Sequence, residues 1–217
     1  LIDELFDNLP ASSWTNPKLT WLDPCSGKGN FLALAYIRLM KGLSKKIRDK
    51  VKRSQHILTN MLYMIEINSS SVQELHKLFG KDANISNADF LDNKKKWEND
   101  LGQTQFDIIV GNPPFQVSKP NKYEGSVGNR TLWDKFLDKT FKEDLIKSKG
   151  YLAFINPSNW RRPEHRIYTL LTRENTLKYL HIYGKKDGQT LLGAQTRFDL
   201  YIVQEGSPNK TQKTHII

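Results

Sequence analysis

Cysteine is almost absent from this sequence of 217 residues, where Cys25 is the only one. A single cysteine excludes an internal disulfide and any zinc site built from several cysteines, and it fits a reducing compartment such as the cytoplasm. The five histidines form no pair at ligand spacing, so we expect no structural metal. No apolar run approaches the ~20 residues of a membrane span, and no basic-then-apolar leader opens the chain. We therefore expect no membrane partner.

Acidic residues are outnumbered, 23 against 33 lysines and arginines, which gives a net charge of +10. An excess of this size favours a polyanionic partner, because displacing counterions from phosphates drives binding. Net charge alone is a weak indicator, since many basic proteins bind no nucleic acid. The length and a hydrophobic share of 38% suit one globular domain over residues 1–217.

Short apolar runs alternate with longer amphipathic stretches, the pattern of a parallel α/β sheet. The sequence predicts seven strands, at Leu19–Asp23, Met61–Ile67, Ala83–Ala88, Phe106–Val110, Tyr151–Ile155, Tyr179–Tyr183 and Phe198–Val203. It predicts helices at Asn30–Lys41, Ser70–Phe79, Thr131–Lys147 and Glu164–Thr176. Gly184–Gln195 is loop-like, so the last two strands lack a connecting helix and can be antiparallel. Thr214–Ile217 resembles a strand cut short, and we expect the natural protein to continue.

Two segments do not fit this alternation. Gln116–Asn129 is polar and glycine-rich, and loops of that length are usually functional or disordered. Lys41–Arg53 is strongly basic, with Asp49 as its one acid. A solvated helix face is the simpler interpretation of the basic segment, and a phosphate-contacting patch is the alternative.

A glycine loop, Asp23-Pro24-Cys25-Ser26-Gly27-Lys28-Gly29-Asn30-Phe31, joins the first strand to its helix. Most Gly-x-Gly turns are only structural, but this one lacks the third glycine of a dinucleotide fingerprint and the Gly-Lys-Ser/Thr of a triphosphate loop. Asp23 at the strand end would repel a phosphate. A cationic ligand with hydroxyl and amino groups fits better, and S-adenosylmethionine has a sulfonium, a ribose and an ammonium.

Acids also follow the next two strands. Glu66 closes the second strand, where a carboxylate can accept both hydroxyls of a ribose. Asp89 follows the third, where it can accept from an adenine amine while Phe90 lies against the ring. Either acid alone is more often an exposed turn or capping residue. Their placement at successive strand ends favours the binding interpretation.

Asn112-Pro113-Pro114-Phe115 directly follows the fourth strand. Two adjacent prolines forbid helix and leave their carbonyls free, which makes a rigid turn. The Asn112 side-chain oxygen and the Pro113 carbonyl can both accept hydrogen bonds from one amino group, and Phe115 offers a flat surface for a base. Orientation would then drive direct in-line methyl transfer without a metal or a covalent intermediate. An ordinary turn with Phe115 in the core is the alternative.

With these motifs in this order, the sequence resembles the amino-methyltransferases of the DNA adenine class found in restriction–modification systems. The match covers nearly the whole chain and includes Gly150–Trp160 and Leu132–Phe136. The resemblance implies a Rossmann-like, doubly wound sheet of seven strands, mostly parallel with the last antiparallel. It implies S-adenosylmethionine as cofactor, bound by Asp23, Pro24, Cys25, Ser26, Gly27, Gly29, Phe31, Glu66, Ile67, Asp89, Phe90 and Asn112. It also implies catalysis by Asn112, Pro113, Pro114 and Phe115.

If duplex DNA is the substrate, the adenine must flip out of the stack to reach Asn112. Residues expected to contact the nucleic acid are Lys119, Lys122, Arg130, Trp160, Arg161 and Arg162, although the two arginines can be simple surface charge. The chain ends where the family's target-recognition domain would begin. We therefore expect recognition to come from outside residues 1–217, in a fused enzyme or on a partner subunit.

Three alternatives remain on sequence grounds. An RNA adenine methyltransferase and a protein glutamine methyltransferase use the same kind of Asn-Pro-Pro-aromatic site on the same fold. A non-catalytic, methyltransferase-like subunit that binds nucleic acid would retain the fold without the activity. The phenylalanine at the fourth position, the long loop and the basic charge favour nucleic acid over protein.

Overall fold

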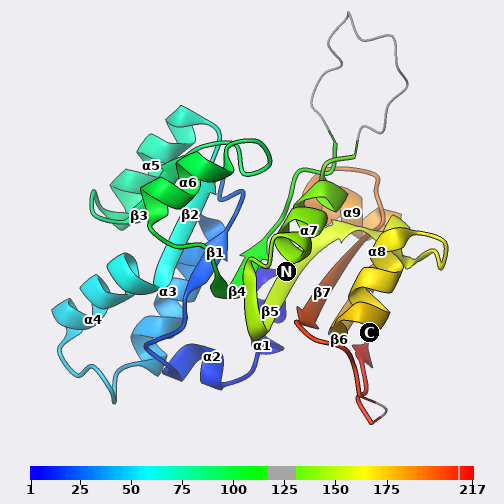
Figure 1. Ribbon diagram of the computed structural model, residues 1–217, viewed down its shortest axis with the longest axis horizontal. Helices are drawn as coiled ribbons and strands as arrows, with labels where there is room; N and C mark the ends of the chain where they lie inside the picture. The colour runs from blue at the N-terminus through cyan, green and yellow to red at the C-terminus, as the bar shows by residue number, and fades with distance from the viewer. Residues whose placement is uncertain (117–130, 210) are drawn as a thin grey trace, which may run out of the picture.

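A single twisted sheet organises the computed structural model, which describes residues 1–116, 131–209 and 211–217 (Figure 1). The strands run in the order β3-β2-β1-β4-β5-β7-β6-β8. Their bounds are β1 Trp21–Asp23, β2 Leu62–Glu66, β3 Asn84–Asn87, β4 Phe106–Gly111, β5 Ile146–Pro157, β6 Thr176–Tyr183, β7 Phe198–Gln204 and β8 His215–Ile216. All pairings are parallel except those of β7, which runs antiparallel to both β5 and β6.

Helices cover both faces of the sheet. They are α1 Ile2–Asp7, α2 Ser12–Thr15, α3 Asn30–Gly42, α4 Lys50–His56, α5 Ser69–Phe79, α6 Lys94–Leu101, α7 Trp133–Lys142, α8 Arg166–Thr169 and α9 Lys185–Leu192. Short π-helical turns at Ile57–Met61 and Leu170–Glu174 lead into β2 and β6, and a 3-10 turn spans Ser158–Arg161. Among the described residues, no helix is long and apolar enough to cross a membrane.

Each face of the sheet has its own hydrophobic core. Residues of α1, α3 and α5 pack on one face around Trp21, which we call the first core. Residues of α6, α7 and α8 pack on the other face around Leu22, the second core. Neighbouring residues of a strand point to opposite faces, so the central strands need apolar side chains at nearly every position. This requirement explains the continuous apolar runs that identified the strands.

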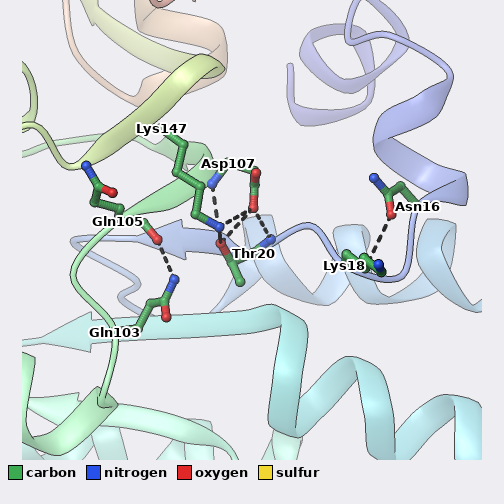
Figure 2. A network of polar contacts seen from close by, with 7 residues as sticks. All are labelled: Asn16, Lys18, Thr20, Gln103, Gln105, Asp107 and Lys147. Atoms are coloured by element: carbon green, nitrogen blue, oxygen red, sulfur yellow. Dashed lines mark hydrogen bonds and ion pairs between the residues drawn. The ribbon is translucent and has the colours of Figure 1, made fainter.

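A polar cluster fixes the starts of three central strands (Figure 2). The Asp107 carboxylate in β4 accepts hydrogen bonds from the Thr20 amide at 2.8 Å, from the Thr20 hydroxyl at 2.9 Å and from Lys147 Nζ of β5 at 2.8 Å. Burial alone would raise the pKa of Asp107, but the Lys147 ammonium and the Thr20 donors hold it below its usual value. The cluster sets the relative register of β1, β4 and β5 at the edge where the strands begin.

The predicted α/β class and the antiparallel Phe198–Val203 strand are confirmed, but the strand count is wrong. The sheet has eight strands, because the C-terminal segment pairs with β6 as β8. Gly184–Gln195 is also not a loop, since it contains α9. Asp187 caps that helix by accepting from the Gly184 amide at 2.9 Å.

Two predicted helices are too long. The predicted helix Thr131–Lys147 ends at Lys142 in the structure, because Asp144 adopts a left-handed φ of 51° and Ile146 pairs with Phe106 as the start of β5. The predicted helix Glu164–Thr176 is reduced to α8 and the π-helical turn that follows it.

The basic segment Lys41–Arg53 is not one helix face either. It spans the end of α3, a connecting loop and the start of α4. Arg53 is buried and donates to the carbonyls of Ile47 and Arg48, so this cation stabilises the loop.

Candidate active site

A cavity of about 550 Å³ lies where β1, β2, β3 and β4 end, at the sheet edge opposite the Asp107 cluster. It is lined by Pro24, Cys25, Glu66, Ile67, Ala88, Asp89, Phe90, Leu91, Pro114, Gln116, Leu132 and Phe136. The carboxyl ends of parallel strands are where open α/β sheets bind ligands. The structure therefore brings together seven of the residues predicted from the sequence: Pro24, Cys25, Glu66, Ile67, Asp89, Phe90 and Pro114.

The two glycines of the loop after β1 have different roles. Gly27 has a φ of 52°, and a Cβ added there would meet nothing within 4 Å, so it leaves open space beside the backbone. Gly29 has a φ of 81°, and a Cβ there would lie 2.7 Å from Leu75 and 2.8 Å from Phe79 of α5. Gly29 is thus needed for packing as well as for its left-handed backbone, whereas Gly27 suits close approach by a ligand.

Glu66 is held in a fixed orientation at the end of β2. Its Oε2 accepts from the Gly27 amide at 2.8 Å and its Oε1 accepts from the Asn68 amide at 2.7 Å. Each carboxylate oxygen has a second lone-pair direction, so Glu66 keeps acceptor capacity for hydroxyl groups. Asp89 is oriented similarly, because its Oδ1 accepts from the Leu91 amide at 2.8 Å.

Asp23 lies beneath the cavity and does not line it. The side chain is buried with 1% exposure, and its Oδ1 accepts from the Cys25 amide at 3.1 Å. Burial raises the pKa of Asp23 to about 7, and the nearby Glu66 carboxylate adds to this effect. The sequence missed Gly111, where an added Cβ would lie 3.2 Å from Asp23 Oδ1. A glycine just before Asn112 was the available signal.

Several predicted cofactor residues support the cavity from below or within its wall. Ser26 is buried and donates to the Asp23 carbonyl at 2.9 Å, and Phe31 packs in the first core. Phe90 does line the cavity, but its ring is stacked with Phe136 at 5.1 Å and with Trp97 at 5.9 Å. These rings fix the orientation of Phe90, and its contact with an adenine ring stays a prediction.

Cys25 contributes a neutral thiol to the lining. Burial raises the pKa of Cys25 well above its usual value, and the nearby Asp23 and Glu66 carboxylates act in the same direction. A thiol that stays protonated is a poor nucleophile. Cys25 is thus suited to packing against a ligand.

The tetrapeptide Asn112–Phe115 forms one rim of the cavity. Asn112 is exposed directly after β4, Pro113 is buried, and Pro114 lines the cavity. Phe115 is half-buried against the first core and does not line the cavity. A base stacked on Phe115 would therefore lie outside this cavity.

The charge of the lining is unlike that of the whole protein. Among the described residues of the lining, Glu66 and Asp89 are the charged ones, and none is a lysine or arginine. Ile67, at the rim, is 65% exposed and offers an apolar surface to a ligand in the cavity. An acidic, partly apolar cavity suits a cationic ligand with an apolar body, and S-adenosylmethionine has this chemistry.

The predicted nucleic-acid contacts have different outcomes. Lys119, Lys122 and Arg130 lie outside the described residues. Trp160 is 1% exposed and packs edge-on against Tyr201 in the second core, so the expectation that its side chain contacts nucleic acid is wrong. Arg161 and Arg162 are accessible at the end of β5, next to a different cavity.

Comparison with known proteins places this geometry in a family. The model of the Eco57I restriction-modification methylase family matches residues 32–188, which include Asn112 and its rim of the cavity. The chain belongs to the Eco57I restriction-modification methylase family. It is therefore a member of a methyltransferase family.

Individual relatives agree with this assignment. An uncharacterized adenine-specific methylase of Mycoplasma pneumoniae is 26% identical over 84% of this chain and 59% of its own length. The type II methyltransferase M.VspI of a Vibrio species is 27% identical over 70% of this chain and 34% of its own. This family member thus spans about three fifths and one third of these two proteins.

A solved structure supports the fold. A protein of Listeria monocytogenes, assigned to the class I S-adenosylmethionine-dependent methyltransferases, superposes with a TM-score of 0.60 at 12% identity, over 99% of this chain and 62% of its own. The sheet of this family member is therefore the class I methyltransferase sheet.

Proposed function

We propose that the protein transfers a methyl group from S-adenosylmethionine to the exocyclic amine of adenine in DNA. One observation carries the proposal: a cavity with Glu66 and Asp89, and with no lysine or arginine among its described lining residues, reaches Pro114 of the segment Asn112-Pro113-Pro114 that follows β4. The cavity suits the cationic cofactor, and the tetrapeptide offers the acceptors that hold an amine.

S-adenosylmethionine would supply an electrophilic methyl group on its sulfonium. Glu66, fixed by the Gly27 and Asn68 amides, would accept from the ribose hydroxyls. Asp89, which lines the cavity after the neighbouring strand β3, would accept a hydrogen bond from the adenine amine of the cofactor. Ile67 and Leu91 would cover its apolar surface. None of the lining residues that the structure describes is a cation that would repel the sulfonium or the ammonium.

The substrate amine would be held by Asn112 and Pro113. The Asn112 side-chain oxygen and the Pro113 carbonyl can each accept one N–H, which directs the nitrogen lone pair toward the methyl donor. In the transfer, a nitrogen–carbon bond would form as the sulfur–carbon bond of the bound cofactor breaks, and the amine would then lose one proton to solvent. The transfer would be direct, with no covalent bond to the protein. The rate enhancement would therefore come from holding the amine and the methyl group in the right orientation.

Adenine in DNA is favoured over other amines by three facts. The Mycoplasma pneumoniae relative is described as adenine-specific, and the family model is one of restriction-modification methylases. The net charge of +10 suits a polyanion. The target base would have to leave the duplex to reach Asn112, which is exposed at the sheet edge. Cytosine also has a planar amine, so the modified base must be identified directly.

The test is methylation of long random-sequence DNA with labelled cofactor, followed by mapping of the modified bases. We expect N6-methyladenine, and we expect its loss in Asn112→Ala. Structured RNA and a protein release factor are assayed in parallel. Label in protein alone, or equal activity of Asn112→Ala, would contradict the proposal.

A non-catalytic subunit is the alternative from another functional class. Calorimetry with S-adenosylmethionine separates the two, because a degenerate subunit should show no heat of binding. The open space beside Gly27 and the oriented Glu66 favour a cavity that still binds its cofactor.

A further inference from the structure

A second cavity, of about 670 Å³, opens at the same edge of the sheet. It lies between the end of β5, the start of α9 and the segment that leads into β7. Four cations line it, namely Arg161, Arg162, Lys185 and Arg197, and no acid is found among the lining residues within the described ranges. The charge of this cavity is thus opposite to that of the cofactor cavity.

Arg161 is fixed within this cavity by a buried partner. Its Nε donates to Asp199 Oδ2 at 2.9 Å, and Asp199 has 0% exposure in β7. The Arg161 side chain itself is 34% exposed. Its two terminal guanidinium nitrogens form no hydrogen bond with any residue that the structure describes. A guanidinium held through Nε presents these nitrogens as a preformed fork for two oxygens of an anion.

The other three cations have no counter-charge within the part of the chain described. Arg162, Lys185 and Arg197 form no ion pair there, unlike Lys94, which lies 2.9 Å from Glu143, or Arg38, which lies within 2.7 Å of Asp3 and Asp7. Gathering unpaired like charges around one hollow is unfavourable unless an anion neutralises them. The polar groups of Ser158, Asn159 and Thr196 in the same lining add hydrogen-bonding capacity.

The position of the second cavity relates it to Asn112. Gly111 of β4 is paired with Phe154 of β5, so the next residue, Asn112, lies level with Ile155. Pro157, which lines the second cavity, is two residues farther along β5. At ~3.3 Å per residue and ~4.8 Å between strands, the separation is on the order of 8 Å. Successive phosphates of one strand rise ~3.4 Å along the helix axis and lie farther apart than that in space, so this distance is on the scale of a neighbouring nucleotide.

We propose that the second cavity binds the phosphodiester backbone of the substrate strand next to the target nucleotide. Arg161 would contact phosphate oxygens through its fork, and Arg162, Lys185 and Arg197 would neutralise the charge. The inference rests on the proposed function, because it takes Asn112 as the place of the target base. The strand would then pass Asn112 with the cofactor cavity on one side and its phosphates on the other.

The test compares two double variants that remove the same charge. Arg162→Gln with Arg197→Gln changes the cavity and leaves the Arg161–Asp199 pair intact. The control is Lys77→Gln with Lys213→Gln, because both lysines are exposed and form no ion pair within the described ranges. Both lie far from the second cavity: Lys77 is in the last turn of α5, and Lys213 is beside the start of β6. Binding of a fluorescent oligonucleotide duplex is measured across a salt series, and binding of inorganic phosphate is measured by calorimetry.

We expect the cavity variant to bind DNA about tenfold more weakly at moderate salt. The slope of log Kd against log salt should fall by about 2, which corresponds to two lost phosphate contacts. The control should change much less. Cofactor affinity of both variants, measured by calorimetry, should equal that of the wild type.

Two results would overturn the inference while leaving the proposed function standing. One is DNA binding and salt slope equal in the cavity variant and the control, with methylation by the wild type intact. The other is phosphate binding that the cavity variant loses without any change in DNA binding, which would indicate a site for free phosphate. Absence of methyl transfer by the wild type to any substrate would instead contradict the proposed function, and absence of DNA binding would contradict both.

Discussion

Glu66 Oε2 accepts a hydrogen bond from the Gly27 amide at 2.8 Å, and this bond joins the end of β2 to the glycine loop after β1. The same carboxylate binds the Asn68 amide at 2.7 Å, where α5 begins. One acid therefore positions two of the backbone segments around the cofactor cavity while facing into it. Its removal should affect ligand binding more than global stability.

Glu66→Gln is predicted to weaken cofactor binding by at least about tenfold. Glutamine keeps one acceptor oxygen but presents an NH₂ group to either Gly27 or Asn68, and it removes a negative charge that faces the cationic ligand. Calorimetry with S-adenosylmethionine measures the effect. Glu164→Gln, at an exposed position, is the matched control and should bind as the wild type does. Equal affinities of the two variants would contradict the role of Glu66.

Gly29→Ala is predicted to destabilise the protein more than Gly27→Ala. Both substitutions place a Cβ on a left-handed backbone, which costs roughly 1–2 kcal/mol. Only Gly29→Ala also forces Leu75 and Phe79 to move, which adds about 1–3 kcal/mol. Urea denaturation gives the two free energies of unfolding. Gly27→Ala should instead bind the cofactor more weakly than Gly29→Ala, as measured by calorimetry. If Gly27→Ala were the less stable variant and Gly29→Ala the weaker binder, the two glycines would not have these separate roles.

Asp23 is predicted to make stability fall as pH rises toward neutrality. Its pKa is about 7 in the folded protein, against about 3.8 when unfolded, so the folded state binds the proton more tightly between these values. The wild type should therefore lose roughly 2–3 kcal/mol relative to Asp23→Asn between about pH 5 and about pH 8. Urea titrations of both proteins across this range measure the difference. Parallel profiles would show that Asp23 does not titrate there.

Asp107→Asn is predicted to destabilise the fold by about 1–2 kcal/mol at neutral pH, because Lys147 and Thr20 lose a charged acceptor. The pKa of Asp107 is lowered in the folded state, so its contribution is present above the unfolded pKa and is lost as pH falls through the folded value. The difference from the wild type, measured by denaturation, should shrink in acid. Cofactor affinity should be unchanged, since the cluster lies at the opposite edge of the sheet; a loss of affinity would indicate that the two edges are coupled.

The sequence predicted the strands around the site well because burial on both faces requires largely apolar runs. Phe106–Val110 is such a run, apolar at every position except Asp107, and the observed β4 extends it by one residue. The acids and glycines that follow these strands could also be predicted to lie together, because the ends of parallel strands meet at one edge of the sheet. The order of the motifs along the chain was thus sufficient to assemble most of the cofactor cavity.

The errors arose where a tertiary contact decides the outcome. Gly184–Gln195 is loop-like in sequence, yet Gly188 lies inside α9. Glycine is needed there because an added Cβ would lie 2.0 Å from the Thr196 carbonyl oxygen. Trp160 follows a strand in a basic stretch and resembles a base-stacking residue, but it fills the second core against Tyr201. Neither contact leaves a local signal in the sequence.

The direction of β7 has a consequence for how members of this family can diverge. Because β7 runs against β5 and β6, the chain leaves β6 and enters β7 at the edge that carries Asn112. Any residue inserted between Gly184 and Arg197 therefore emerges at the edge of the sheet that carries Asn112, while the pairing of the strands stays as it is. Surface connections tolerate changes of length far better than strands do. This hairpin is a place where new substrate preferences can evolve without a new fold.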